Sequence, residues 1–224
     1  MQAFLRLPFD FDPVALLRDL RTCEALSWPA HFHAEDYSGS WTSIALRSAS
    51  GTAGDILSHP GSSYRDTELL AQCPYFSHVL QRFACELESA RLLNLAPGSV
   101  IKEHCDPCTA YRHGVFRIHV PLATSEDVHF LIGGQRLAMR AGECWYGDFS
   151  LPHSVENRGG AARVNLVIDC KRNVWSDDVF ARAGYDFAAE AEAMRPDAAT
   201  RERMIAELRL IGTEAAHKLI LSLQ

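Results

Sequence analysis

The chain has 224 residues, of which 47% are hydrophobic and 22% charged, a composition that is typical of a globular protein and excludes a disordered or fibrous one. Acidic residues outnumber basic ones by 28 to 22, and the formal net charge of −6 argues against a nucleic-acid partner, because phosphate binding depends on excess Lys and Arg. No stretch approaches the ~20 apolar residues of a membrane helix, and residues 1–10 lack a secretory signal pattern, so a cytoplasmic location is expected.

The first predicted helix begins at Asp12-Pro13 and continues to about Leu26. A carboxylate at the N-cap followed by proline in the first turn is a common helix start. A second helical segment is predicted over about 67–88, with Pro74 as the residue expected to interrupt it.

From residue 91 to 169 the pattern changes to short apolar runs separated by turn residues. Strands at a spacing of about 8–12 residues are typical of an antiparallel sandwich or barrel. The predicted strands cover 41–47, 91–95, 116–122, 128–132, 135–139, 143–146 and 163–169, with a hairpin turn at Gly133-Gly134. The predicted fold class is therefore mainly β with flanking helices.

After Asp177 the chain is predicted to be helical again. Apolar residues recur there at steps of three or four and mark one helix face, which we expect to pack on the sheet: Met204, Leu208, Ile211, Ala215, Leu219 and Leu223. No linker rich in Pro, Gly or Ser interrupts the chain, so a single domain over 1–224 is predicted, with its β core at about 40–170.

The main candidate site is His104-Cys105-Asp106 together with His153. In an extended segment residues i and i+2 point to the same side, so the imidazole of His104 and the carboxylate of Asp106 can converge. His153 ends a hairpin-rich stretch that could return the chain to the same sheet. Two imidazoles and one carboxylate with open positions are the ligand set of non-haem Fe(II) oxygenases. Histidines satisfied in the core or at the surface are the competing interpretation.

Two predicted strands place polar residues on one face. Alternation puts Arg117 and His119 on one side of the 116–122 strand, and it puts Arg163 on the polar side of the 163–169 strand. If the apolar sides pack against helices, these polar side chains turn inward, where a buried guanidinium needs an anion such as a carboxylate. A solvent-facing position for both arginines is the alternative.

These segments together resemble the aspartyl/asparaginyl β-hydroxylase-like group of Fe(II)/2-oxoglutarate dioxygenases, which includes bacterial proline hydroxylases. The matching segments are 96–106, 116–122, 142–154 and 163–169. The resemblance implies a double-stranded β-helix (jelly-roll, cupin-like) core with iron ligands His104, Asp106 and His153. It also implies that Arg163 binds the distal carboxylate of 2-oxoglutarate and that Arg117 and His119 contact the carboxylate nearer the metal.

The implied cofactors are Fe(II), 2-oxoglutarate and dioxygen. The implied reaction is hydroxylation of an unactivated C–H bond in a small amino acid or related metabolite, with release of succinate and CO2. A peptide aspartyl/asparaginyl hydroxylase, a non-catalytic metal-binding sensor and a zinc or manganese isomerase are the alternatives, and the oligomeric state is left open. One departure from the group is Leu93, which falls where some relatives have a hydroxyl-bearing residue that helps to hold 2-oxoglutarate.

Cys105-x-x-Cys108 could, with His104, form part of a zinc site, although no second Cys/His pair stands at suitable spacing. We expect Cys105 to lie in packing and Cys108 in the following loop. Arg112 and His113 are expected near the mouth of the site, where one of them is a candidate to bind a substrate carboxylate. Surface or capping roles are expected for His31, His33, His59, His78 and His217.

Overall fold

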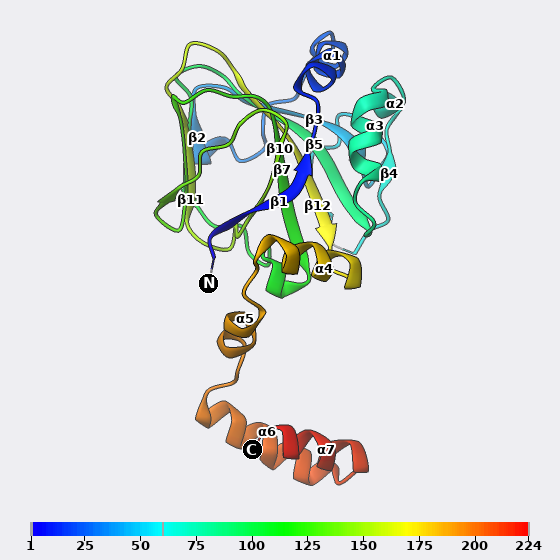
Figure 1. The fold of residues 1–224 in the computed structure, drawn as a ribbon, viewed down its shortest axis with the longest axis vertical. Helices are drawn as coiled ribbons and strands as arrows, with labels where there is room; N and C mark the ends of the chain where they lie inside the picture. The colour runs from blue at the N-terminus through cyan, green and yellow to red at the C-terminus, as the bar shows by residue number, and fades with distance from the viewer. Residues whose placement is uncertain (1, 60, 224) are drawn as a thin grey trace. The chain divides into compact units, whose positions relative to one another are not determined.

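The computed structural model describes residues 2–59 and 61–223. The described chain divides into two compact units, 2–185 and 186–223, and each is considered on its own (Figure 1).

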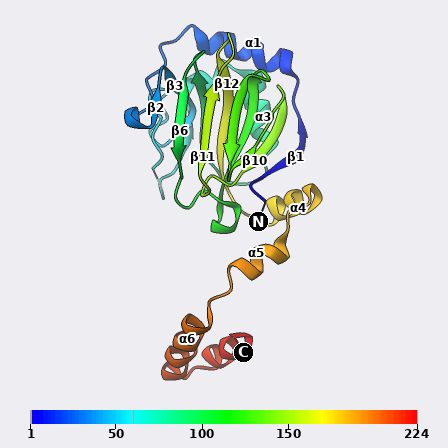
Figure 2. The ribbon, with the colours of Figure 1, turned by 90° about the vertical axis from the view of Figure 1, so that its left-hand side faces the viewer.

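The larger unit is built from two antiparallel sheets (Figures 1 and 2). One sheet contains β1 (Phe4–Asp10), β3 (Trp41–Ser48), β4 (Arg65–Asp66), β5 (Leu87–Leu95), β7 (Val115–Ala123), β10 (Glu143–Gly147) and β12 (Arg163–Lys171). The other contains β2 (Tyr37–Ser38), β6 (Val100–His104), β8 (Val128–Ile132), β9 (Gln135–Arg136) and β11 (His153–Asn157).

The order of the strands is that of a double-stranded β-helix. The larger sheet runs β1-β10-β7-β12-β5-β3-β4, and the smaller sheet runs β2-β6-β11-β8-β9. From β5 onward the chain passes back and forth between the sheets, so that strands distant in sequence, such as β6 and β11, become neighbours. The predicted fold class, mainly β with flanking helices and a jelly-roll core, is confirmed.

Short helices flank the larger sheet. They are α1 (Pro13–Glu24), α2 (Glu68–Ala71), α3 (Pro74–Gln81) and α4 (Val174–Ala183). Of two 3-10 turns, η2 (Tyr111–His113) contacts β7 of this sheet, and η1 (Ala34–Asp36) contacts β2 and β6 of the smaller one. In Figure 1, α2 and α3 lie on the side of the larger sheet that faces away from the smaller one. The side chain of Asp12 accepts a hydrogen bond from the backbone of Val14, as expected for the start of α1.

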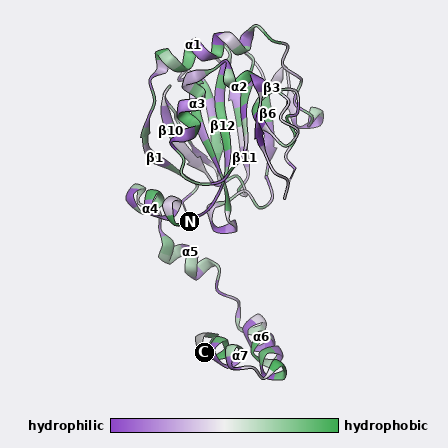
Figure 3. Ribbon diagram, turned by 90° about the vertical axis from the view of Figure 1, so that its right-hand side faces the viewer, coloured by the Kyte–Doolittle hydropathy of each residue, from purple (hydrophilic) through white to green (hydrophobic). Residues whose placement is uncertain are grey.

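An apolar core fills part of the space between the sheets. It consists of Ala3, Trp41, Leu95, Ile101, Val128, Phe130, Ile132, Leu137, Phe149 and Val155, all buried. Figure 3 shows apolar residues along the strands of this unit. Because these side chains come from β3 and β5 on one side and from β6, β8 and β11 on the other, they hold the two sheets face to face.

The helix predicted over 67–88 is wrong in its second half. Two short helices, α2 and α3, are separated at Gln72-Cys73, so the interruption expected near Pro74 is confirmed, and Pro74 itself begins the second helix. Residues from Leu87 onward belong to β5, a central strand buried on both sides. Such a strand needs no alternation of apolar and polar residues, so its sequence resembles a helix as much as a strand.

Five strands were not predicted as strands: β1, β2, β4, β6 and β11. The run predicted over 135–139 is strand only at β9. The other predicted strands are confirmed to within a few residues.

The smaller unit contains α5 (Phe187–Ala193), α6 (Ala198–Ile211) and α7 (Glu214–Leu223). The predicted continuous helix face is wrong, because Gly212 adopts a left-handed conformation (φ +62°) and ends α6. The helical nature of the segment is confirmed, whereas its packing on the sheet and the single-domain organisation stay predictions. In the described part of the chain no helix is long and apolar enough to cross a membrane.

Candidate metal centre and active-site cavity

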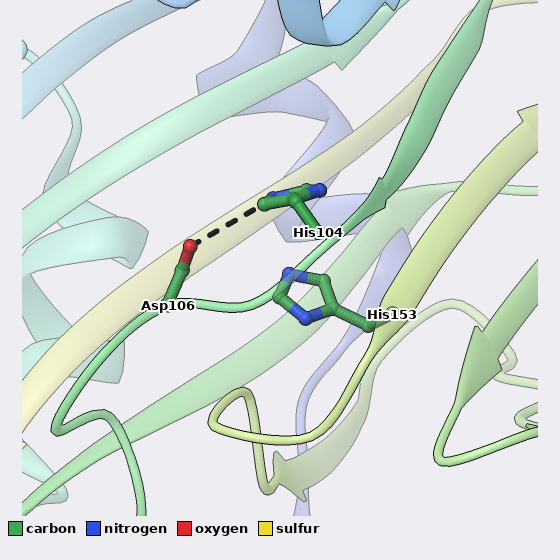
Figure 4. A group of neighbouring side chains, drawn as sticks. All are labelled: His104, Asp106 and His153. Carbon is green, nitrogen blue, oxygen red and sulfur yellow. Dashed lines mark ion pairs between the residues drawn. The ribbon is translucent and has the colours of Figure 1, made fainter.

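Pairing of β6 with β11 brings three predicted ligands together. His104 is the last residue of β6 and lies opposite His153, the first residue of β11. Asp106 follows two residues later, where its backbone N–H donates to the carbonyl of Phe149 at 2.8 Å. One ligand atom from each of His104, Asp106 and His153 lies within 4.8 Å of the others. Figure 4 shows these three side chains. The predicted convergence of the three side chains is therefore present.

Both imidazoles are held by backbone carbonyls. Nδ1 of His104 lies 2.8 Å from the carbonyl oxygen of Lys102, and Nδ1 of His153 lies 3.0 Å from that of Leu151. A proton on each Nδ1 makes these contacts hydrogen bonds and leaves Nε2 free to bind a metal. Burial lowers the pKa of His153, which favours the neutral form that a metal requires.

Asp106 supplies a charged oxygen ligand. Burial alone would raise the pKa of this carboxyl, but the adjacent Arg117 guanidinium and the imidazoles of His153 and His104 hold it below its usual range. The carboxylate forms an ion pair with Arg117, and its Oδ1 lies 3.7 Å from Nε2 of His104. Two imidazoles and one carboxylate suit a divalent transition metal with open positions.

A cavity of about 270 Å³ extends from these ligands into the space between the sheets. Its polar lining includes His31, His33, Asp36, Arg91, Arg117, His119 and Arg163, and its apolar lining includes Phe32, Trp41, Leu93, Ile101, Phe130 and Phe149. The predicted inward orientation of Arg117, His119 and Arg163 is thus observed.

Arg163 is a buried cation without a carboxylate partner. Its side chain forms no ion pair within the described ranges, and its guanidinium lies over the ring of Phe130 at 5.1 Å. When the side-chain amide of Asn165 is oriented to satisfy its neighbours, its oxygen accepts from Nη2 of Arg163 at 2.7 Å. Burial lowers the pKa of Arg163 to about 10. A buried guanidinium with an unused Nε–H is suited to bind an anion that enters the cavity.

Arg117 and His119 both lie on β7 and line the same cavity as Arg163 and the metal ligands. Nε and Nη2 of Arg117 donate to Asp169 at 2.7 and 3.3 Å, and Nη1 donates to Asp106. Nε2 of His119 is buried and has no hydrogen-bond partner among the residues that the structure describes. Burial and the nearby Arg163 keep the pKa of His119 well below its usual value, so this ring is neutral.

His31 is the residue that sequence reasoning misplaced most. It is buried rather than at the surface, lines the cavity and stacks on Trp41 with ring centroids 3.5 Å apart. Burial lowers its pKa to about 3. Its backbone N–H donates to the carbonyl of Trp41, which extends the pairing of this segment with the edge of β3. The alternation of His31 and His33 just before a strand was the only sequence signal that could have shown this.

Two other expectations need correction. Arg112 pairs with Asp148 and donates to Ser150 at 2.7 Å, and neither Arg112 nor His113 lines the cavity. Cys105 is exposed rather than packed, whereas Cys108 lies in the following loop as expected, and both are exposed free thiols. Over residues 2–59 and 61–223 the one cluster that could hold a metal consists of His104, Asp106 and His153, so neither thiol contributes to it.

Comparison with known proteins identifies similar sequences. The model of a family described as aspartyl/asparaginyl β-hydroxylase matches residues 16–173. The chain is 29% identical over 200 residues to L-proline cis-3-hydroxylase 1 of a Streptomyces species, and the match covers 87% of this chain and 67% of that protein. It is 26% identical over 164 residues to L-proline cis-4-hydroxylase of Rhizobium meliloti, covering 71% of this chain and 57% of that protein, so it spans little more than half of that relative. A solved structure of a Pseudomonas putida prolyl-4-hydroxylase aligns with a TM-score of 0.49 and 12% identity over 77% of this chain and 94% of that one.

Proposed function

The chain belongs to the aspartyl/asparaginyl β-hydroxylase family, and from that premise we propose that it is an Fe(II)- and 2-oxoglutarate-dependent dioxygenase. Its proposed reaction is hydroxylation of an unactivated C–H bond of a small amino acid or related metabolite, with release of succinate and CO2.

The observation that carries this proposal is the placement of an unpaired buried cation in the same cavity as the three metal ligands. Arg163 has no carboxylate partner, whereas His104, Asp106 and His153 form a cluster at the cavity wall. A ligand that both chelates a metal and presents a distant carboxylate satisfies the two features together, and 2-oxoglutarate has that chemistry. The residues therefore fit both the metal and the cosubstrate.

Each residue has a distinct role in this proposal. His104, Asp106 and His153 hold Fe(II), which supplies the activation of dioxygen when it is bound. Arg163 binds the distal carboxylate of 2-oxoglutarate. Arg117 and His119 border the carboxylate nearer the metal, because both line the cavity and Arg117 keeps N–H donors beyond the three engaged with Asp106 and Asp169. Between these groups, Phe130 and Phe149 exclude water and orient the reactants.

A small substrate is supported by the size of the cavity and by the relatives. The space of about 270 Å³ has to accommodate both the cosubstrate and the substrate, which favours a compact molecule over a folded protein segment. Two similar proteins are named as hydroxylases of L-proline. We therefore propose a free amino acid or a close analogue as the substrate class.

The test is a panel of free amino acids incubated with the protein, Fe(II) and 2-oxoglutarate in air. We expect one or a few members to gain the mass of one oxygen atom, with stoichiometric succinate release. Arg158→Ala, at an exposed arginine outside the cavity, serves as the control and should retain turnover. A protein that binds iron but forms succinate with no member of the panel, and without substrate, would contradict the proposal.

A further inference from the structure

We infer that Asp169 is a positioning residue which, through Arg117, fixes the carboxylate oxygen that Asp106 offers to the metal. This inference rests on the proposed function, because it assumes that Asp106 is a metal ligand.

Three neighbouring strands of the larger sheet build the arrangement. Asp169 on β12 lies directly opposite Arg117 on β7 in the register of the sheet. Its Oδ1 accepts from Nε of Arg117 at 2.7 Å, and its Oδ2 accepts from Nη2 at 3.3 Å, so the pair is bidentate. From β5, Ser89 Oγ donates to Oδ2 at 2.7 Å, and Nη2 of Arg91 donates to Oδ2 at 2.9 Å.

The carboxylate of Asp169 is an internal, fully engaged anion. Asp169 is 4% exposed and is not among the residues that line the cavity. Burial would raise its pKa, but Arg117 and Arg91 hold it below the usual range. Asp169 itself does not line the cavity, but its partners Arg117 and Arg91 do, and of the two it is Arg117 that contacts a metal ligand, Asp106.

The orientation of Arg117 decides the geometry of Asp106. With Nε and Nη2 committed to Asp169, Nη1 reaches the Oδ2 atom of Asp106. Oδ1 of Asp106 is the oxygen that lies 3.7 Å from Nε2 of His104, on the side of the ligand cluster. The structure thus presents Oδ1 as a single metal-facing oxygen and occupies Oδ2 with a hydrogen bond, a pattern in which groups behind the ligands tune a metal site.

Removing the charge of Asp169 should weaken the metal site in a specific way. Arg117 would keep its full positive charge with only Asp106 left as an anionic partner, so its fork would turn toward both oxygens of that carboxylate. The guanidinium would then compete with the metal for Oδ1. Loss of the negative charge of Asp169 does not weaken the attraction of the cavity for an anion. The affinity for 2-oxoglutarate should therefore not fall by the same mechanism.

The experiment measures Co(II) binding to the metal-free full-length protein by calorimetry and by the visible absorption of the bound ion. For Asp169→Asn we expect the dissociation constant to rise about tenfold or more, with a changed absorption spectrum. The control is Asp19→Asn, since Asp19 is also a buried carboxylate, accepts from the backbone N–H groups of Tyr75 and Phe76, and lies outside the cavity. That variant should lose stability without any change in Co(II) affinity or spectrum.

Should Asp169→Asn fail to fold, Ser89→Ala removes one of the three partners of Asp169 and should shift Co(II) affinity in the same direction by a smaller factor. Wild-type affinity and spectrum in a folded Asp169→Asn protein, or in Ser89→Ala when the first variant does not fold, would overturn the inference while leaving the proposed metal centre intact. Absence of Co(II) binding by the wild-type protein would instead overturn the metal centre, and this inference with it.

Discussion

At the scale of single residues, the site combines ligands that are fixed in advance with a cation that lacks its counter-ion. The imidazoles of His104 and His153 are anchored through Nδ1, and Asp106 is anchored through its backbone and Arg117. Arg163 is different, because its desolvation is not offset by any carboxylate of the described chain. The burial of Arg163 without a carboxylate partner thus lowers the stability of the free protein, and binding of a dianion at this position would restore it.

Replacement of Arg163 by Met should therefore raise the KM for 2-oxoglutarate by about 10- to 100-fold, the range expected when a charge-assisted contact worth about 1.5–3 kcal/mol is lost. Co(II) affinity should remain unchanged, because Arg163 is not part of the ligand cluster. The free protein should keep or gain thermal stability, since an unpaired buried charge has been removed. An unaltered KM for 2-oxoglutarate in this variant would show that the anion binds elsewhere.

Replacement of His153 by Ala should abolish iron-dependent turnover and weaken Co(II) binding, because one of only two imidazole ligands is lost. The measurement is succinate release with a saturating substrate, together with calorimetric metal titration. The matched control is His129→Ala, on β8 outside the cavity, which should bind the metal normally. Full activity in His153→Ala would remove this residue from the metal centre.

At this scale, prediction from sequence succeeds where the spacing of two residues determines the side to which their side chains point. His104 ends β6 and Asp106 follows two residues later, a spacing from which the sequence predicted both on one side. The network around Asp169 could not be predicted, because its partners Ser89 and Arg91 lie on a strand whose pairing depends on the tertiary structure. The burial of His31 was not predicted for the same reason, because it depends on a tertiary contact, the stacking of the ring on Trp41.

At the scale of elements, the turns decide whether the strands reach the site in register. Gly142, just before β10, has φ +84°, and a Cβ atom there would lie 2.2 Å from the carbonyl oxygen of Phe11. Its backbone N–H donates to Pro121 and its carbonyl accepts from Phe11, so the turn joins β10, the end of β7 and the chain after β1. No side chain fits this position without displacing backbone.

Gly142→Ala should therefore lower the free energy of unfolding by about 2 kcal/mol or more, through strain at a left-handed position and a clash with backbone. Chemical denaturation followed by circular dichroism measures the effect. Gly160→Ala is the matched control, because no atom lies within 4 Å of its Cβ position and its φ is not left-handed. Equal stability of the two variants would contradict the structural argument.

Element prediction succeeded where strands carry apolar residues between clear turn signals, as in β7, β8 and β12. It failed at the start of β5, where 87–88 were assigned to a helix, because burial on both sides removes the alternation that distinguishes a strand from a helix. It failed for α6 and α7 because the apolar spacing continues through Gly212, whose left-handed conformation interrupts the helix.

At the scale of the whole molecule, the metal ligands, the cavity and the residues around them all belong to the unit 2–185. The family model also ends within it, at residue 173. In the other unit, α6 has no buried residue, and Leu210 and Ile211 are largely exposed.

A chain shortened to 1–185 should therefore retain Co(II) binding and hydroxylation within about twofold, since every residue assigned to the site is present. Turnover and metal titration of the shortened and full chains provide the comparison. A loss of Co(II) binding on shortening would show that the smaller unit supports the site and would favour the single-domain organisation expected from the sequence.

The direct pairing of His104 with His153 has a mechanical consequence. A bound ion would link β6 to β11, two paired strands that are about fifty residues apart in the chain. Their pairing has a register shift just beyond His153, between His153 and Val155. Metal and folding are then thermodynamically linked, and saturation at about 100 times the dissociation constant should add about 2.7 kcal/mol to stability. Removal of the ion with a chelator should lower the melting temperature. Hydrogen exchange should rise first at the paired ends of β6 and β11, next to His104 and His153, because the ion no longer links them.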